Sequence, residues 1–264
     1  MKIGVFISDD RMKIVAEILQ NHFEVFEMDE NESQRHLKKL APLLDAVLLP
    51  AWSVEPDGFI QMQSRGLYIA EFLESLSDEC ILFAGKDSSF LHHLSLQKRF
   101  WLKDETLLLR NAELTAEGLL ARIITVSEKS LDEITIDVIG SGRCASAVIE
   151  LLSNLNCHYR MITRNPERFD TSSDLVELSQ WKKDDPSEII VNTAPVCVID
   201  CSTVSNWKDI KHVFDISTGF VGMDEKCRNH PFVRLYKENA LPSRFSKRSA
   251  ALLIVNYVRK ELMI

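Results

Sequence analysis

The sequence predicts an α/β protein with two Rossmann-like domains, each a mostly parallel sheet with helices on both faces. Two observations lead to this fold class. Strand-like apolar runs alternate with segments that have apolar residues at helical spacing along the whole chain. In addition, a glycine turn, Gly140-Ser141-Gly142, separates such a run from such a segment near the middle of the chain. A linking helix and a closing helix at the C-terminus complete the expected architecture.

The N-terminal domain is expected to span residues 1–110. Its strand and helix patterns occupy residues 1–7, 11–19, 23–28, 46–49 and 80–84. The first turn, Ser8-Asp9-Asp10-Arg11, carries two acids and no glycine, so a second dinucleotide is not expected there. Ser53 follows the third strand, where open α/β sheets bind ligands, and is a candidate substrate contact. An ordinary turn serine is the open alternative.

The other expected segments are a linking helix over 111–130, a cofactor domain over 131–243 and a C-terminal segment over 244–264. The linking helix is indicated by apolar residues at helical spacing from Ala116 to Ile124, and Ser127 to Glu133 forms a polar link after it. The closing helix has the same spacing between Ala250 and Val258, and we expect it to pack on the first domain. Residues 170–184 are compatible with a short strand or a helix.

The cofactor domain opens with a strand over 134–139, a glycine turn and a helix. In such a unit the first glycine permits the turn, the second lets the backbone approach a pyrophosphate, and a third small residue, here Ala145, lets the helix pack on the strand. Unpaired N–H groups at the helix start favour anions. Asp137 interrupts the strand and costs stability unless it is paired. The residues expected to bind the cofactor here are Gly140, Ser141, Gly142, Arg143, Cys144 and Ala145.

The end of the next strand, Cys157 to Thr163, indicates which dinucleotide is bound. A carboxylate for the adenosine ribose is expected about 20 residues after the glycines, but Arg164 stands at that place. Guanidinium groups pair with a 2′-phosphate, and Arg168 could close the other side. This favours NADP over NAD, with Thr163, Arg164, Asn165 and Arg168 as contacts. Two solvated surface arginines are the alternative.

Further strands are expected over 188–191, 213–216 and 232–235. The first of them ends in a short polar turn, which can contact the nicotinamide or its ribose through backbone and amide groups. The residues of this turn are Asn192, Thr193, Ala194 and Pro195.

Composition excludes several classes of function. The formal net charge of −8 argues against a nucleic-acid surface, which needs clustered Lys and Arg. The six cysteines form no C-x-x-C pair, so we expect reduced thiols in a cytoplasmic protein. Cys197 and Cys201 are four residues apart but have no second Cys or His pair that could complete a zinc site, so we expect no metal site. No signal peptide pattern and no run of about 18 apolar residues is present, so no membrane association is expected.

Taken together, these motifs resemble the A subunit of dipicolinate synthase, an enzyme family of endospore-forming bacteria, over nearly the whole chain. The motifs that carry the resemblance are LLPAWS, CILFAG, RNAELTAEG, VIGSGRCA, MITRNPER, VNTAP, FDIS and LPSRFSKRSAALL. The cofactor half is also similar to shikimate dehydrogenases, in which an arginine turn holds the NADP phosphate. The resemblance implies an NADP-dependent oxidoreductase that acts on a cyclic tetrahydrodipicolinate-type dicarboxylate, and it implies a partner, a flavoprotein second subunit. The resemblance is also compatible with assembly of this protein into a homo-oligomer.

The family positions also imply site residues. Asn111, Thr115 and Glu117 correspond to residues that border the family's cleft, and Glu117 is the candidate acid or base; a first-turn glutamate that stabilises a helix is the alternative. Arg244 and Lys247 are candidate donors for the dicarboxylate. This chain departs from the family at Thr-Gly-Phe-Val-Gly (218–222) and Ala-Leu-Pro-Ser (240–243), where the family has more glycine, and the replacement narrows the space for substrate.

Two other functions compete with this one. A non-catalytic NADP(H)-binding subunit would keep the dinucleotide groove without turnover, as the replaced glycines suggest. A small-acid dehydrogenase of the shikimate dehydrogenase type is the other, but the N-terminal serine pair and the lysine-aspartate arrangement of that family are missing.

Overall fold

The structure is a computed structural model that describes residues 1–52, 54–169 and 174–263. The chain divides into two compact units: unit 1 comprises residues 1–111 and 246–264, and unit 2 comprises residues 112–245. The long helix α5 (Glu105–Ser127) continues from the first unit into the second. Each unit contains its own parallel sheet, which confirms the predicted fold class.

Unit 1 is built on five parallel strands in the order β2-β1-β3-β6-β7, the order of flavodoxin-like folds. The strands are β1 (Lys2–Phe6), β2 (Glu24–Met28), β3 (Ala46–Leu48), β6 (Ile81–Ala84) and β7 (Gln97–Phe100). The sequence predicts the first four. It misses β7, whose residues read QKRF, because an edge strand that is only partly buried has no apolar pattern.

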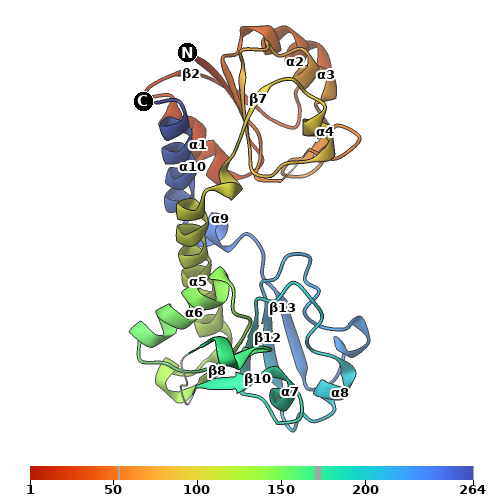
Figure 1. Ribbon diagram of the computed structural model, residues 1–264, viewed down its shortest axis with the longest axis vertical. Helices are drawn as coiled ribbons and strands as arrows, with labels where there is room; N and C mark the ends of the chain where they lie inside the picture. Colours follow the sequence, from red (N-terminus) through yellow and green to blue (C-terminus); the bar gives the residue numbers. More distant parts are fainter. Residues whose placement is uncertain (53, 170–173, 264) are drawn as a thin grey trace. The chain divides into compact units, whose positions relative to one another are not determined.

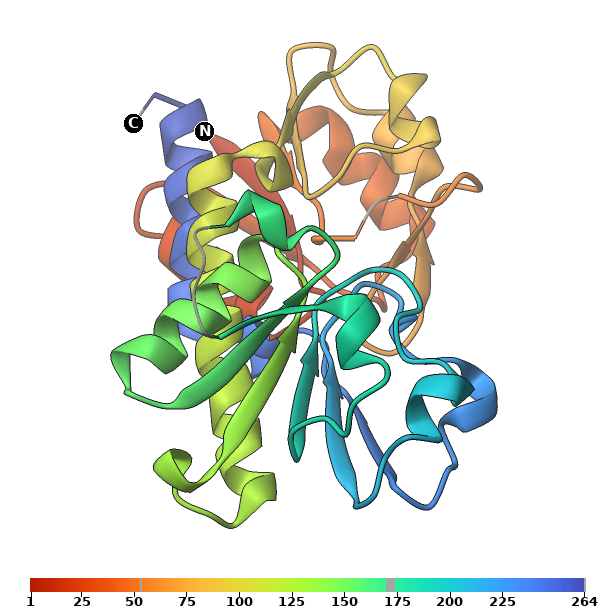
Figure 2. The same ribbon diagram turned by 60° about the horizontal axis from the view of Figure 1, so that its bottom comes forward.

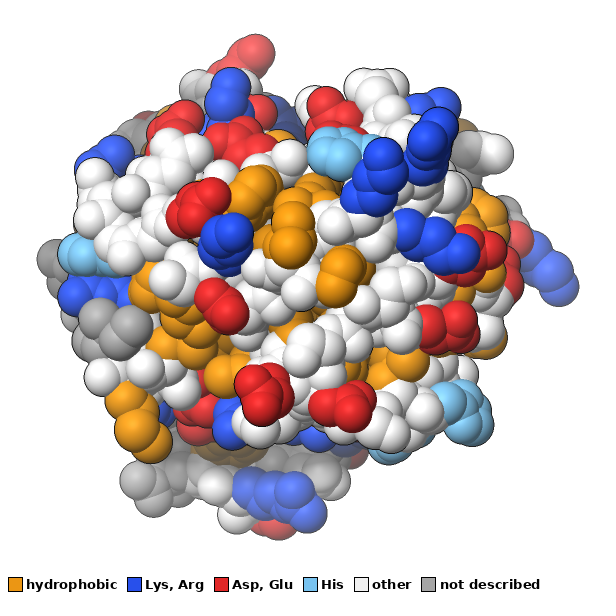
Figure 3. Space-filling model, turned by 90° about the horizontal axis from the view of Figure 1, so that it is seen from above, with side chains coloured by type: hydrophobic (Ala, Val, Ile, Leu, Met, Phe, Trp, Pro, Cys, Tyr) orange, Lys and Arg blue, Asp and Glu red, His pale blue; other side chains and the backbone are white. Residues whose placement is uncertain are grey.

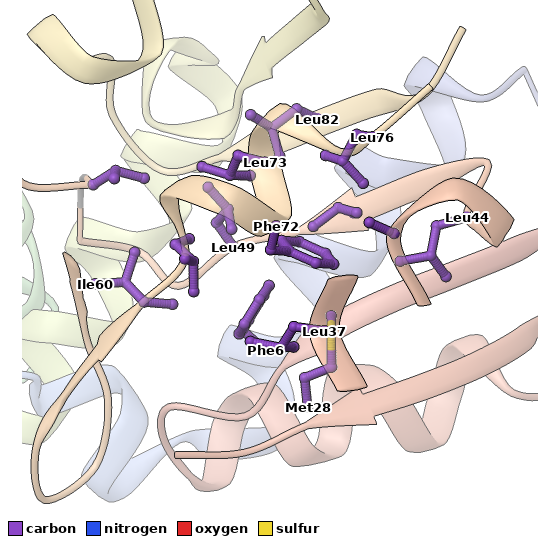
Figure 4. Packing of buried hydrophobic residues seen from close by; sticks show 14 of the residues in the cluster. Phe6, Met28, Leu37, Leu44, Leu49, Ile60, Phe72, Leu73, Leu76 and Leu82 are labelled. Carbon is purple, nitrogen blue, oxygen red and sulfur yellow. The ribbon is translucent and has the colours of Figure 1, made fainter. Parts of the chain in front are cut away.

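The two faces of this sheet are covered by different elements. One face packs on α2 (Gln34–Leu40), α3 (Ala70–Glu74), α4 (Ser89–His92) and the hairpin β4 (Phe59–Gln61) and β5 (Gly66–Tyr68). Figure 4 shows Phe6 and Phe72 at the centre of this core, and their rings meet edge to face with centroids 5.5 Å apart. Burial of such large apolar side chains is the main stabilising term of the unit.

On the other face, α1 (Asp10–Leu19) and α10 (Lys247–Glu261) pack side by side (Figure 1). The Asp9 carboxylate caps α1 by accepting the Met12 N–H at 3.0 Å, which satisfies one of the free donors of the first turn. The apolar faces of the two helices then meet over Met12, Val15, Ile254 and Val258, all buried. The chain's last helix thus belongs to the core of unit 1.

Unit 2 is built on six parallel strands in the order β10-β9-β8-β11-β12-β13. This is the strand order of the dinucleotide-binding Rossmann fold, in which direction along the sheet reverses between the first and fourth strands. The strands are β8 (Thr135–Ile139), β9 (His158–Thr163), β10 (Leu175–Glu177), β11 (Ile189–Asn192), β12 (Lys211–Asp215) and β13 (Val233–Lys237).

Helices cover both faces of the unit 2 sheet (Figure 2). One face packs on α5, α6 (Arg143–Asn154) and α9 (Leu241–Phe245), and the other on α7 (Leu178–Trp181) and α8 (Cys201–Val204). The segment that the sequence leaves open, residues 170–184, contains both kinds of structure, since β10 is followed directly by α7. Its residues 170–173 lie outside the described part of the chain.

Asp137, the acid that interrupts the apolar run of β8, is fully buried and fully paired. Its carboxylate accepts two hydrogen bonds from the Arg160 guanidinium, each 2.7 Å long, and one from Trp181 Nε1 at 2.7 Å. The N–H and hydroxyl of Ser187 donate to it as well, at 3.0 and 2.9 Å. The predicted misfit is therefore compensated by strong charge-assisted hydrogen bonds that join β8, β9 and α7.

On the face shown in Figure 3, side chains of both charges are present, with several Lys and Arg gathered at the upper right and hydrophobic side chains near the centre. In the described part of the chain, no helix combines the length and the apolarity needed to cross a membrane. All six cysteines are free thiols.

Candidate dinucleotide-binding site

The glycine turn lies at the carboxyl edge of the unit 2 sheet, directly after β8. Gly140 has a φ of +124°, which favours glycine, and a Cβ at this position would overlap the Oγ1 of Thr193. Its N–H donates to the carbonyl of Ile162 in the neighbouring strand at 3.0 Å. Gly140 is therefore required both by backbone conformation and by the close approach of the turn after β11.

The second glycine has a different role. Gly142 caps α6 in an extended conformation that other residues also adopt, and a Cβ built on it would meet nothing within 4 Å. The space in front of the helix start is therefore open. Gly142, the N-cap residue of α6, has no side chain that could accept a hydrogen bond from the first turn, so the helix start offers N–H groups to an anion.

The rest of the predicted glycine motif has the expected surroundings. Ser141 and Arg143 are exposed, and Cys144 is half-buried, with burial raising the pKa of its thiol. Ala145 is fully buried between α6 and the sheet, in one core with Ile136 and Val138 of β8. A larger side chain at 145 would push the helix away from the strand, so the third small residue of the motif is explained by packing.

The turn after β9 presents two arginines to solvent. Thr163 is buried, and its hydroxyl accepts the Asn165 N–H at 3.3 Å, just before the 3₁₀ helix η4 (Pro166–Arg168). The side chains of Arg164 and Arg168 are exposed, and no hydrogen bond or ion pair engages either guanidinium group within the described residues. Both cations are thus available to an anionic ligand at this edge of the sheet.

The turn after β11 contacts the glycine turn directly. The N–H and the hydroxyl of Thr193 both donate to the carbonyl of Ile139, the last residue of β8, at 3.0 Å each. The Asn192 side chain is fully buried and bonds to both backbone groups of Ala194, whereas Pro195 is exposed. The predicted residues therefore all lie at, or directly after, the carboxyl ends of three adjacent strands: Gly140 to Ala145, Thr163 to Arg168 and Asn192 to Pro195.

The residues proposed for catalysis lie on α5. Asn111 and Thr115 are one helical turn apart and half-buried, and Glu117 is exposed. Gly118, next to them, has a packing role, because a Cβ there would lie 3.1 Å from Leu241 and 3.2 Å from Phe245. The absence of a side chain lets α9 approach α5 closely.

The residues proposed for substrate binding have other contacts. Arg244 pairs with Glu238, with 2.6 Å between Nη1 and Oε2, and Lys247 pairs with Asp10. A dicarboxylate that binds either cation would therefore compete with a carboxylate of the protein itself for part of its hydrogen-bonding capacity. Ser53 lies outside the described residues.

Besides Asp137, two further buried acids of unit 2 have no counterpart among the predicted site residues. Glu238, after β13, accepts from Arg122 at 2.6 Å as well as from Arg244. Burial opposes ionisation, but these two hydrogen bonds and the two positive charges hold the pKa of Glu238 below its usual range. Asp215 ends β12 and is 1% exposed. The signal for it in the sequence is an acid as the last residue of an apolar strand, VFD, at the ligand-binding edge of the sheet.

Solved structures share this fold over nearly the whole chain. The A subunit of dipicolinate synthase from Bacillus halodurans matches with a TM-score of 0.79 and 16% identity, covering 99% of this chain and 97% of that one. The A chain of dipicolinate synthase from Bacillus subtilis matches with a TM-score of 0.77 and 16% identity, covering 100% and 96%. A D-lactate dehydrogenase from Treponema pallidum matches with a TM-score of 0.61 and 12% identity, covering 98% and 95%.

At this level of identity the structures establish the fold. The fold resemblance to the A subunit of dipicolinate synthase that the motifs predict is confirmed. The chain thus shares its fold with a dipicolinate synthase A subunit and a D-lactate dehydrogenase. No protein-family model and no curated protein matches the sequence.

Proposed function

We propose that this protein is an NADP-dependent oxidoreductase similar to the A subunit of dipicolinate synthase. The observation that carries the proposal is the pairing of the uncapped α6 N-terminus, open at Gly142, with the exposed guanidinium groups of Arg164 and Arg168. The helix start supplies N–H donors for a pyrophosphate. The two arginines supply the bidentate donors that a 2′-phosphate requires.

The proposed substrate is a cyclic tetrahydrodipicolinate-type dicarboxylate that carries a hydroxyl group. When bound, the nicotinamide would take a hydride from the carbon that bears this hydroxyl, and the hydroxyl proton then needs a base. We assign that role to Glu117, with Asn111 and Thr115 as polar contacts on the same helix. A flavoprotein second subunit is the partner that this function implies.

The test is a calorimetric titration followed by a turnover assay. NADPH and NADH are titrated separately into the protein, and NADPH is expected to bind at least about tenfold more tightly because of the charged contacts to its 2′-phosphate. Hydroxy-tetrahydrodipicolinate, prepared from aspartate semialdehyde and pyruvate, is then added with NADP⁺, and the absorbance of NADPH is followed. Equal affinity for both dinucleotides would contradict the cofactor assignment.

A second function is favoured by one specific observation. The two cations proposed for the dicarboxylate, Arg244 and Lys247, are both engaged by carboxylates of the protein itself. This supports a non-catalytic subunit that binds NADP(H) without turning over a dicarboxylate. This alternative would be supported if the protein binds NADPH tightly but shows no turnover, either by itself or after the flavoprotein partner is added.

A further inference from the structure

Asp215 is a buried carboxylate that joins the two loops next to the glycine turn. Its Oδ1 accepts from Asn192 Nδ2 at 3.0 Å, from the Ser217 N–H at 3.0 Å and from the Ser217 hydroxyl at 2.6 Å. Its Oδ2 accepts from the Gly222 N–H at 3.1 Å. One side chain at the end of β12 therefore fixes the turn after β11 and both ends of the segment 217–222.

Neutral groups provide all the hydrogen bonds that this carboxylate receives in the described structure. In the described part of the chain no Lys, Arg or His side chain forms an ion pair with Asp215. A buried carboxyl group without a cationic partner is stable in a protein interior only when fixed donors satisfy its oxygens. The carboxylate and the two loops thus depend on each other for their arrangement.

The loop from Ser217 to Gly222 has a specific backbone conformation and is contacted by neighbouring side chains. Gly219 and Phe220 both have positive φ values, +82° and +52°. A Cβ at Gly222 would overlap the Asn192 side chain amide, so the loop lies directly against the β11 turn. The guanidinium group of Arg228 donates to the carbonyls of Phe220 and Met223 at 3.2 Å each.

Asp215 and the residues bonded to it lie on the side of the sheet where the nicotinamide half of a dinucleotide is expected. Asn192 is paired in register with Ile139 of β8 on one side and with Asp215 on the other. In a Rossmann sheet a dinucleotide crosses the boundary between the first and fourth strands, which here are β8 and β11. Arg164 marks the adenine side beyond β9, so the nicotinamide half extends over β11 and β12.

We infer that Asp215 is a positioning residue for the nicotinamide half of the cofactor. It holds the turn after β11 and the loop after β12 in one arrangement before the ligand binds, and this lowers the ordering cost of binding. The inference rests on the proposed dinucleotide binding and adds to it a residue that contacts no ligand atom itself.

The test variant is Asp215→Asn, which keeps the size of the side chain and one acceptor oxygen. The new NH₂ group faces a backbone donor, the Gly222 N–H, so the contact to Oδ2 is lost. NADPH affinity should fall about tenfold because a buried donor loses its acceptor and the loop loosens. Affinity for adenosine 2′,5′-bisphosphate, which contains only the adenine half, should change less than about twofold.

The matched control is Asp137→Asn, which alters an equally buried aspartate in the middle of the same sheet. The Asp137→Asn protein should unfold at a lower temperature than the wild type. The ratio of its affinity for NADPH to its affinity for adenosine 2′,5′-bisphosphate should be the same as in the wild type. A merely structural role of Asp215 predicts that Asp215→Asn behaves like the control, and that result would overturn the inference.

A measurement without ligand separates the inference from the function on which it rests. Hydrogen exchange of the Ser217 and Gly222 amides should be faster in Asp215→Asn than in wild type, while amides of β9 keep their protection. If wild-type protein binds neither ligand, the proposed function fails and the positioning role fails with it. If wild-type protein binds both and the variant loses both equally, only the positioning role is refuted.

Discussion

The hydroxyl oxygen of Thr193 occupies the place where a Cβ of Gly140 would lie, and the same hydroxyl donates to the carbonyl of Ile139 at 3.0 Å. The turn after β11 and the glycine turn after β8 are therefore packed as one unit. The close contact requires glycine at 140 but imposes no such requirement at 142. The two glycines of one motif thus have separable roles.

Substitution of each glycine by alanine should show this separation. Gly140→Ala introduces a Cβ at positive φ against Thr193 and should lower the free energy of unfolding by about 2 kcal/mol or more. Gly142→Ala should change it by less than about 0.5 kcal/mol but weaken NADPH binding, because its methyl group enters the space in front of α6. Urea denaturation and calorimetry measure the two quantities. A stable Gly140→Ala protein would contradict the packing argument.

Arg164→Ala should affect the two dinucleotides differently. Loss of a charge-assisted contact to the 2′-phosphate should weaken NADPH binding by about tenfold or more, with NADH changed by less than about twofold. Arg234→Ala is a suitable control. This exposed arginine lies near the amino end of β13, whereas Arg164 follows the carboxyl end of β9. An equal loss for both dinucleotides would show that Arg164 does not contact the phosphate.

Asp137→Ala should destabilise unit 2 without a direct effect on ligand contacts. The substitution leaves the Arg160 guanidinium, the Trp181 indole N–H and the Ser187 donors without their acceptor, at a cost of about 3 kcal/mol. Calorimetric unfolding of the full chain measures the loss. Asp132→Ala removes an exposed acid just before the same strand and should be nearly neutral. If Asp137→Ala changes the free energy of unfolding only slightly, the hydrogen bonds around Asp137 contribute little to stability.

Glu238 should make the stability of unit 2 sensitive to acid. Arg122 and Arg244 outweigh burial and hold the folded-state pKa of Glu238 below its ordinary value of 4.5, so its contribution is present above that pH and is lost as the pH falls through the folded value. The stability difference between wild type and Glu238→Gln should therefore shrink below pH 4.5.

Unfolding curves at neutral and acidic pH measure this difference. Glu225→Gln is the control, because the exposed Glu225 carboxylate pairs only at the surface with Arg228 and surface pairs contribute little. A difference for Glu238→Gln that stays constant with pH would show that the ion pairs do not depress the pKa of Glu238.

The sequence by itself determined the fold class and the glycine turn, because both depend on local patterns. Apolar residues with the spacing of strands and helices, such as those around β8 and α6, must bury one face in any compact arrangement. A glycine turn between a strand and a helix is a local sequence motif that is typical of a Rossmann-type βαβ unit. Where these patterns are weak, as in the polar edge strand β7, no element could be predicted.

Only the tertiary structure decided how the polar groups pair. Asp137 meets Arg160 through strand register, Asp215 meets Gly222 through the shape of a loop, and Glu238 engages the arginine that was expected to bind substrate. Glu238 also pairs with Arg122, which lies 116 residues away in sequence. A buried charge selects its partner by distance and direction in the folded chain, and neither quantity is encoded in local residue spacing.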